Sequence, residues 1–350
     1  MLKNTSDKKK KNSLQIKIII LVVSLVALTI IASSSLVILR LFNAQNRLHL
    51  SDDILDSLLI RTVIISGALI VLAFLLAILF SKKVAKPHIL EMMAISAQKE
   101  RMETELNIAA QIQTDTLPAG FPLFPERTEF EVYATMDPAR EVGGDFYDIF
   151  LIDDDHLTLV VGDVSDKGVP AALFMMITKT LIKTRTLSGG SPAEILTEVN
   201  NQLTDANVGE MFVTVWLGIL NLSTGQLVSA NAGHENALVR KKNEGYSLQK
   251  TQHGLVLGSM KNMKYRDDDI VLAPGDILFM YTDGVLDATD SDDNRWGSER
   301  MIEALNRNRE KSPTELLPAM KAEVDAFVGE ASQFDDVTML AVKYDGQIMH

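Results

Sequence analysis

The chain has 350 residues, enough for two or three structural units, and a composition of 47% hydrophobic and 23% charged residues excludes a disordered chain. It contains no cysteine, which excludes disulfides, thiol nucleophiles, iron–sulfur clusters and cysteine-bound zinc. The formal net charge of −12 argues against nucleic acid as a partner, because binding to a phosphate backbone requires a basic face.

Two uncharged apolar runs occupy the first quarter of the chain, at residues 18–39 and 62–80. About 20 apolar residues in a helix span the hydrocarbon core of a bilayer. A cleaved signal peptide is the alternative for the first run, but this run is longer than a signal sequence requires and no small-residue cleavage site follows it. We therefore predict that residues 1–82 anchor the chain in the lipid bilayer through two transmembrane helices.

The lysines that flank these runs predict the orientation. They stand at positions 8–11 and 17 before the first run and at 82, 83 and 86 after the second. Because lysine-rich flanks stay on the cytoplasmic side, we expect a multi-pass protein of the cell (inner) membrane with both termini in the cytoplasm. The connection between the runs is short for a ligand-binding domain, so a plain connector is the simpler interpretation.

Residues 83–117 contain no glycine and consist mainly of helix-forming residues. Apolar residues recur there at three- and four-residue steps, which makes one stripe along a helix: Ile95, Met102, Leu106, Ala109 and Ala110. A helix that continues from a membrane span commonly pairs with its own copy. We expect a signalling helix that forms a homodimer; the alternative is that it packs on the domain that follows.

Beyond Pro118 the sequence changes to short β-prone runs, turns and helices. Strands are predicted at residues 129–134, 149–152, 157–161, 212–220, 227–230, 277–281 and 337–343. Helices are predicted at 170–186, 191–203 and 312–328, the last two opening with the capping boxes SPAE and SPTE. Paired strands interrupted by paired helices indicate an α+β fold with antiparallel sheets covered by helices.

Acidic residues recur at turns beside these strands. Asp145 follows two glycines in EVGGDFYD, and Asp163 ends a strand in GDVSDKG. Asp283 follows another strand in YTDG, while Asp335 and Asp336 precede the last strand in FDDVT. One such turn is ordinary loop chemistry, but four of them indicate a common site.

These motifs, in order with GVPAALFM, MFVTVWLGIL and NAGHENALV, resemble the bacterial PPM-type (PP2C-like) serine/threonine phosphatases of the SpoIIE/RsbU group over residues 100–345. The resemblance implies that residues 118–350 form a PP2C-like antiparallel β-sandwich flanked by helices. It also implies a membrane-anchored phosphatase that acts on phosphoserine or phosphothreonine of a bacterial regulatory protein, an anti-sigma-factor antagonist.

The resemblance further implies a centre of two Mn²⁺ or Mg²⁺ ions on which catalysis depends. Carried over by motif, Asp145, Asp163 and the Val164 carbonyl hold the metals, and Asp283 and Asp335 complete the set. Of the final pair, Asp335 is favoured over Asp336 as the ligand. Hard divalent cations prefer oxygen donors, and two of them acidify a bridging water that attacks phosphorus in line.

Three further residues lie in or beside these motifs. Arg140, just before EVGGD, is a candidate contact for the substrate phosphate. His234 in NAGHEN is interpreted as part of a structural turn rather than as a general acid. Lys167 adjoins the Asp163 turn, in a neighbourhood that the family resemblance associates with switching.

Two other functions are compatible with parts of this pattern. The same fold could serve as a catalytically silent receptor that binds a partner without hydrolysis, which weak or absent Mn²⁺ binding would reveal. A two-metal nuclease or cyclic-nucleotide phosphodiesterase is disfavoured, because such sites usually recruit histidines and the six histidines here form no ligand-like pair.

Overall fold

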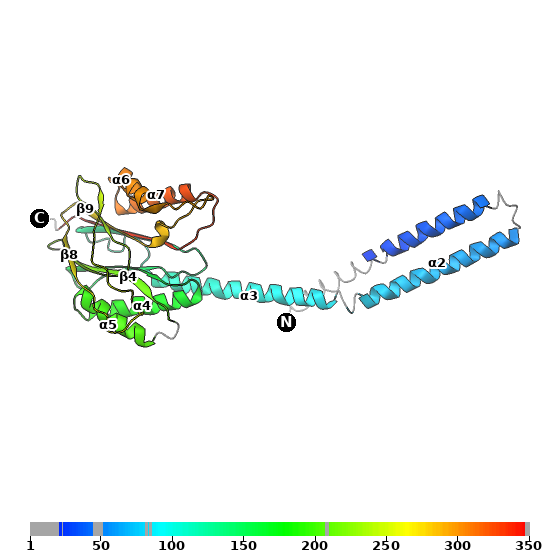
Figure 1. The fold of residues 1–350 in the computed structure, drawn as a ribbon, viewed down its shortest axis with the longest axis horizontal. Helices are drawn as coiled ribbons and strands as arrows, with labels where there is room; N and C mark the ends of the chain where they lie inside the picture. Colours follow the sequence, from blue (N-terminus) through cyan, green and yellow to red (C-terminus); the bar gives the residue numbers. More distant parts are fainter. Residues whose placement is uncertain are drawn as a thin grey trace. The chain divides into compact units, whose positions relative to one another are not determined.

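The computed structural model describes residues 21–22, 24–44, 52–80, 83, 86–206 and 210–346. The chain divides into two compact units, Met1–Glu103 and Thr104–His350 (Figure 1). Each unit is described separately below.

The first unit contains two apolar helices, Ser24–Ala44 and Asp56–Phe80, the second being part of α2 (Asp52–Phe80). Both are long and apolar enough to cross a membrane, and almost none of their surface is buried within the protein. The hydroxyls of Ser34 and Ser66 join the two helices by a hydrogen bond. The lysines at 8–11, 17 and 82, on which the predicted orientation rests, lie outside the described residues.

Helix α3 (Lys86–Thr116) covers most of the segment predicted as helical. Its apolar residues fall into two groups. One group is exposed along the length of the helix: Met92, Ile95, Met102, Ile108 and Ile112. Those of its last turns are half-buried: Leu106, Ala109 and Ala110. The predicted apolar stripe is therefore exposed at Ile95 and Met102 and partly covered at Leu106, Ala109 and Ala110.

The second unit is built on two five-stranded antiparallel sheets. The first sheet has the order β1-β10-β9-β6-β7, with bounds Phe130–Asp137, Val337–Tyr344, Asp276–Tyr281, Leu238–Arg240 and Tyr246–Leu248. The second has the order β2-β3-β4-β5-β8, with bounds Phe146–Leu151, His156–Val164, Val213–Asn221, Gln226–Ala232 and Asp268–Val271. Each sheet places strands from distant parts of the chain side by side.

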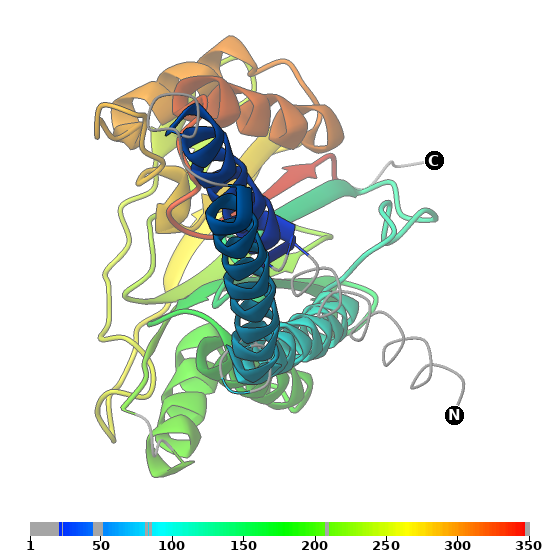
Figure 2. The ribbon, with the colours of Figure 1, turned by 90° about the vertical axis from the view of Figure 1, so that its right-hand side faces the viewer.

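Two helix pairs cover the outer faces of the sheets. Helices α4 (Val169–Leu187) and α5 (Pro192–Ala206) pack on the second sheet, and α6 (Gly297–Arg307) and α7 (Pro313–Val328) on the first. In Figure 2 the green pair and the orange pair lie on opposite sides of the strands. The predicted α+β class and the helix-flanked antiparallel sandwich are therefore confirmed.

Burial follows this layering. One core fills the space between the sheets and under α4 and α5, around Phe146 and Trp216. A second lies between the first sheet and α6 and α7, around Phe279 and Trp296. All six residues of β9 are buried, because both faces of this strand are covered. Such a strand shows no alternation of polar and apolar residues, only an apolar run.

All seven predicted strands and all three helices of the second unit are present, with shifted ends. Strand β2 begins at Phe146, three residues earlier than expected, so Asp145 immediately precedes a strand. The short strands β6, β7 and β8 and helix α6 were not predicted. Three or four residues are too few for a period-two pattern, and α6 begins at a glycine without a side-chain cap.

Candidate functional site

Asp145 is held at the edge between the two sheets. It lies between β1 and β2 and is 2% exposed. The Thr282 hydroxyl, at the end of β9, donates to Asp145 Oδ2 at 2.7 Å. That hydroxyl in turn accepts the Thr338 N–H of β10 at 3.1 Å. A residue that adjoins the second sheet is thus oriented by two strands of the first.

The two glycines before Asp145 are required by close backbone approaches. A Cβ on Gly143 would lie 2.3 Å from Asp336 Oδ2, and one on Gly144 would lie 2.8 Å from the Val164 carbonyl oxygen. Both distances are shorter than any real contact allows. The Asp145 turn, the Val164 carbonyl and Asp336 therefore lie together.

Asp335 and Asp336 face different partners. Asp336 is buried, and its Oδ1 and Oδ2 accept the Ala139 and Gly144 N–H groups, each at 2.8 Å. Asp335 is half-buried, and its Oδ1 lies 2.9 Å from Lys167 Nζ. Asp336 is thus committed to the backbone of the Asp145 turn, whereas Asp335 presents its carboxylate to a cation.

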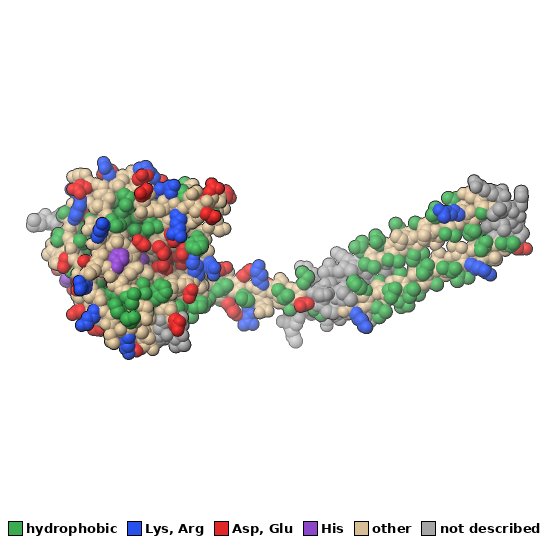
Figure 3. Space-filling model, in the orientation of Figure 1, with side chains coloured by type: hydrophobic (Ala, Val, Ile, Leu, Met, Phe, Trp, Pro, Cys, Tyr) green, Lys and Arg blue, Asp and Glu red, His purple; other side chains and the backbone are tan. Residues whose placement is uncertain are grey.

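Asp163 and Asp283 extend the group toward solvent. Asp163 stands near the end of β3, half-buried, and Asp283 is exposed at the start of the short 3₁₀ helix η2 (Asp283–Val285). Figure 3 shows acidic side chains gathered on one face of the second unit. Asp145, Asp163, Asp283 and Asp335 are called the carboxylate cluster below, and Asp163 and Asp283 leave it open to solvent at one side.

Burial and mutual repulsion disfavour the charged forms of these groups. Burial raises the pKa of Asp163 to about 7, and the charge of Asp283 contributes further. Burial, followed by the charge of Asp163, raises the pKa of Asp145 well above its usual range. Desolvation and the charge of Asp335 raise the pKa of Asp283. The like charges are therefore close enough to repel one another.

The donor set consists of oxygen atoms, which suits Mg²⁺ or Mn²⁺. No three acidic or histidine side chains among the described residues already have the spacing of a formed metal cage. Lys167 is the cation that contacts the cluster, through Asp335, and its Nζ also donates to the Phe334 carbonyl at 2.6 Å. The residues fit a divalent cation by donor type and by excess negative charge.

His234 connects the sheets beside the cluster. It is buried, its Nε2 donates to the Tyr281 carbonyl at 3.1 Å, and its Nδ1 lies 2.8 Å from the Thr214 hydroxyl. Burial lowers its pKa to about 4, so the ring is neutral at pH 7. Since a carbonyl only accepts, Nε2 carries the proton and Nδ1 accepts from the hydroxyl. These contacts agree with the structural role expected for NAGHEN.

Arg140 is exposed, and its guanidinium makes no ion pair with the described residues. It stands five residues before Asp145 in the loop that carries the cluster's first carboxylate. Arg140 is therefore close to Asp145 along the chain, and its side chain is open to solvent.

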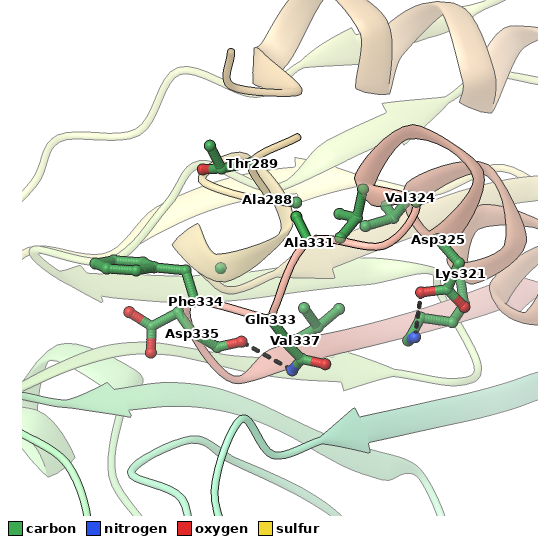
Figure 4. Close-up of a pocket in the computed structure, with 13 residues that line it drawn as sticks. Ala288, Thr289, Lys321, Val324, Asp325, Ala331, Gln333, Phe334, Asp335 and Val337 are labelled. Atoms are coloured by element: carbon green, nitrogen blue, oxygen red, sulfur yellow. Dashed lines mark hydrogen bonds and ion pairs between the residues drawn. The ribbon is translucent and has the colours of Figure 1, made fainter. Parts of the chain in front are cut away.

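A cavity of about 220 Å³ adjoins Asp335 and was not foreseen from sequence. Figure 4 shows Phe334 and Asp335 at one end and Lys321, paired with Asp325, at the other. Apolar side chains such as Val324 of α7 line it between these ends. Its residues come from two segments that are distant in sequence, 284–289 and 321–337, so no local sequence pattern predicts it.

The buried pair Asp148–Lys179 fixes α4 to β2 near the site. Lys179 Nζ lies 2.9 Å from Asp148 Oδ2, and the Lys183 ammonium lies 4.0 Å from the same atom. Both Asp148 and Lys179 are buried, so each charge depends on the other for its stability. Asp148 closes the EVGGDFYD motif, which links α4 to the strand after Asp145.

Comparison with known proteins identifies the family. The model of stage II sporulation protein E (SpoIIE) matches residues 153–345, more than half of the chain. The chain belongs to the SpoIIE family. Asp163, Asp283 and Asp335 of this SpoIIE-family chain lie inside the match, and Asp145 lies before it.

Two relatives extend the likeness. The chain is 34% identical over 267 residues to protein IcfG of Synechocystis sp., covering 68% of this chain and 41% of that protein. It is 30% identical over 189 residues to phosphoserine phosphatase RsbU of Bacillus subtilis, covering 53% of this chain and 55% of that one. The chain thus spans about half the length of these curated relatives.

Solved structures support the fold. The PP2C domain of SiaA from Pseudomonas aeruginosa matches with a TM-score of 0.64 and 26% identity, over 71% of this chain and 100% of that domain. A structure of the PP2C domain of SpoIIE from Bacillus subtilis matches with a TM-score of 0.54 and 18% identity, over 62% of this chain and 63% of that one. The second unit is PP2C-like.

From the raised pKa of Asp163 we predict how the stability of the metal-free protein depends on pH. Its folded pKa of about 7 exceeds its unfolded value of 3.8, so the folded state binds more protons between these values and loses stability as pH rises through them. In EDTA, Asp163→Asn should therefore melt higher than wild type at pH 8. The gain should be small near pH 4, where the folded wild type is protonated and its unfolded state, with a pKa of 3.8, is partly protonated. Melting temperatures of both proteins in EDTA, measured from pH 4 to 8, test this prediction. A difference in melting temperature that does not change with pH would contradict the raised pKa of Asp163.

Proposed function

We propose that this SpoIIE-family chain is a metal-dependent protein serine/threonine phosphatase. The observation that supports this most is the convergence of Asp145, Asp163, Asp283 and Asp335 from four strand ends, where burial and then neighbouring carboxylate charges raise the pKa of the first three. A pair of Mn²⁺ or Mg²⁺ ions would neutralise that charge. The relatives RsbU and RsbP of Bacillus subtilis are named phosphoserine phosphatases.

Within this proposal the residues have distinct tasks. Asp145, Asp163 and the Val164 carbonyl would hold metal together with Asp283 and Asp335. When bound, the ions would supply the Lewis acid that activates water and neutralises phosphoryl oxygens. Thr282 orients the Asp145 carboxylate, and Asp336 holds the turn rather than the metal. Arg140, exposed beside that turn, is the candidate contact for the substrate phosphate.

The substrate class follows from the site and the relatives. A carboxylate cluster open to solvent on one side admits a phosphorylated side chain from another protein. We propose phosphoserine or phosphothreonine on a bacterial regulatory protein of the anti-sigma-factor antagonist type. Until metals reverse the local sign, the negative charge of the site repels phosphate, so activity should depend fully on the ions.

The direct test is hydrolysis by the full-length chain in detergent micelles with Mn²⁺. We expect turnover of p-nitrophenyl phosphate and of phosphoserine peptides, loss of both in EDTA, and background rates for Asp163→Asn, because that substitution removes a central ligand. Turnover that survives EDTA or the substitution would contradict the mechanism. No turnover by a wild-type chain that binds Mn²⁺ weakly or not at all would favour the silent receptor.

Substitutions of Asp335 and Asp336 should have different effects, because we propose that the first binds metal and the second supports the Asp145 turn. Asp335→Asn should weaken Mn²⁺ binding in calorimetry while changing the metal-free unfolding free energy by less than about 1 kcal/mol, because its ion pair is partly exposed. Asp336→Asn should lower that free energy by about 1–3 kcal/mol, since an amide nitrogen would face a backbone N–H. The reverse pattern would assign the ligand to Asp336.

We also propose that the two apolar helices anchor the chain in the cell (inner) membrane with both termini cytoplasmic, and that α3 pairs with a second copy. Their apolar surfaces are not covered by protein, which suits lipid. On α3, Ile95 is 61% exposed and Met102 is 55% exposed, seven residues apart as in a two-helix seam.

Because the chain has no cysteine, single-cysteine variants test both points in cells. An impermeant maleimide should label Asp53→Cys in intact cells, but Ser259→Cys only after permeabilisation. Under oxidation, Ile95→Cys should form a crosslinked dimer, whereas Ala97→Cys, about 200° around the helix, should not. Labelling of Ser259→Cys in intact cells would contradict the topology, and equal crosslinking at positions 95 and 97 would contradict the pairing face.

A further inference from the structure

The last turns of α3 carry a glutamine enclosed by the second unit. Gln113 is 4% exposed. Its Nε2 donates to the Gly143 carbonyl at 2.7 Å, and its Oε1 accepts the Gly143 N–H at 3.1 Å. One side chain therefore satisfies both backbone polar groups of a residue 30 positions away.

The peptide group that joins Gly143 to Gly144 is bound from its other side as well. Its N–H donates to Asp336 Oδ2 at 2.8 Å, while its carbonyl accepts from Gln113. This planar group is thus held at both ends, by α3 and by the segment before β10. Asp145 follows directly, so the fixed peptide sets the direction from which its carboxylate enters the cluster.

A second contact ties the end of α3 to the other side of Asp145. The Tyr147 hydroxyl donates to the Pro118 carbonyl at 2.8 Å, two residues beyond the end of α3. Asp145 is therefore bracketed by contacts at positions 143 and 147. The placement of its carboxylate depends on where the last turn of α3 lies.

From these contacts we infer that Gln113 is a positioning residue, whose amide holds the Gly143–Gly144 peptide and thereby fixes Asp145 for cation binding. The part that concerns the cation rests on the proposed function; the part that concerns the turn rests on the hydrogen bonds alone. Because an α-helix turns about 100° per residue, a shift of α3 by one residue withdraws this amide from Gly143.

The test compares Gln113→Leu with Gln111→Leu in the full-length chain in detergent micelles. Gln111 is exposed and donates to Asp115 on its own helix, which makes it a matched control. Hydrogen–deuterium exchange of residues 138–146 is followed without metal, and Mn²⁺ binding by calorimetry. Loss of buried hydrogen bonds in Gln113→Leu should speed exchange and raise the Mn²⁺ Kd, each by about tenfold or more. Gln111→Leu should match wild type.

Unchanged exchange in Gln113→Leu would overturn the inference, as would faster exchange with unchanged Mn²⁺ affinity or equal effects of the control. If wild type binds no Mn²⁺, the proposed function fails, while exchange alone still decides whether Gln113 holds the turn. Should Gln113→Leu not fold, Gln113→Glu is measured in the same way. It keeps the side-chain length and an acceptor but cannot donate to the Gly143 carbonyl when ionised, so wild-type behaviour would overturn the inference.

Discussion

Carboxylates that repel one another at buried strand ends are the constraint around which the second unit is organised. Burial raises the pKa of Asp145 and Asp163, and each added negative charge raises it further. Left to itself, such a group would separate or take up protons. The packing free energy of the two-sheet core holds the group together despite this repulsion.

The cluster is held mainly by groups that do not belong to it. Asp336 uses both carboxylate oxygens on backbone N–H groups, and Thr282 links Asp145 to β10. His234 joins β4 to the end of β9 while remaining neutral. These contacts cross from one sheet to the other, so the geometry of the site depends on how the two sheets are packed.

Helix α3, which precedes the strands of the second unit in sequence, contacts the backbone around Asp145 directly. Its C-terminal end reaches the backbone before Asp145 through Gln113 and the strand after it through Pro118. On the other side of the site, the buried Lys179–Asp148 pair fixes α4 to β2. The loop and strand on either side of Asp145 are therefore held by two helices that are distant in sequence.

The sequence alone determined the elements and the donor chemistry. Apolar runs, capping boxes and acidic turns marked the main strands and helices and the residues Asp145, Asp163, Asp283 and Asp335, because these signals are local. Tertiary structure decided what local signals cannot: the different partners of Asp335 and Asp336, the short edge strands, the cavity beside α7 and the contact of Gln113 with Gly143. Those features depend on which distant backbone groups come within hydrogen-bonding distance, and only the packing of two sheets and a preceding helix sets that.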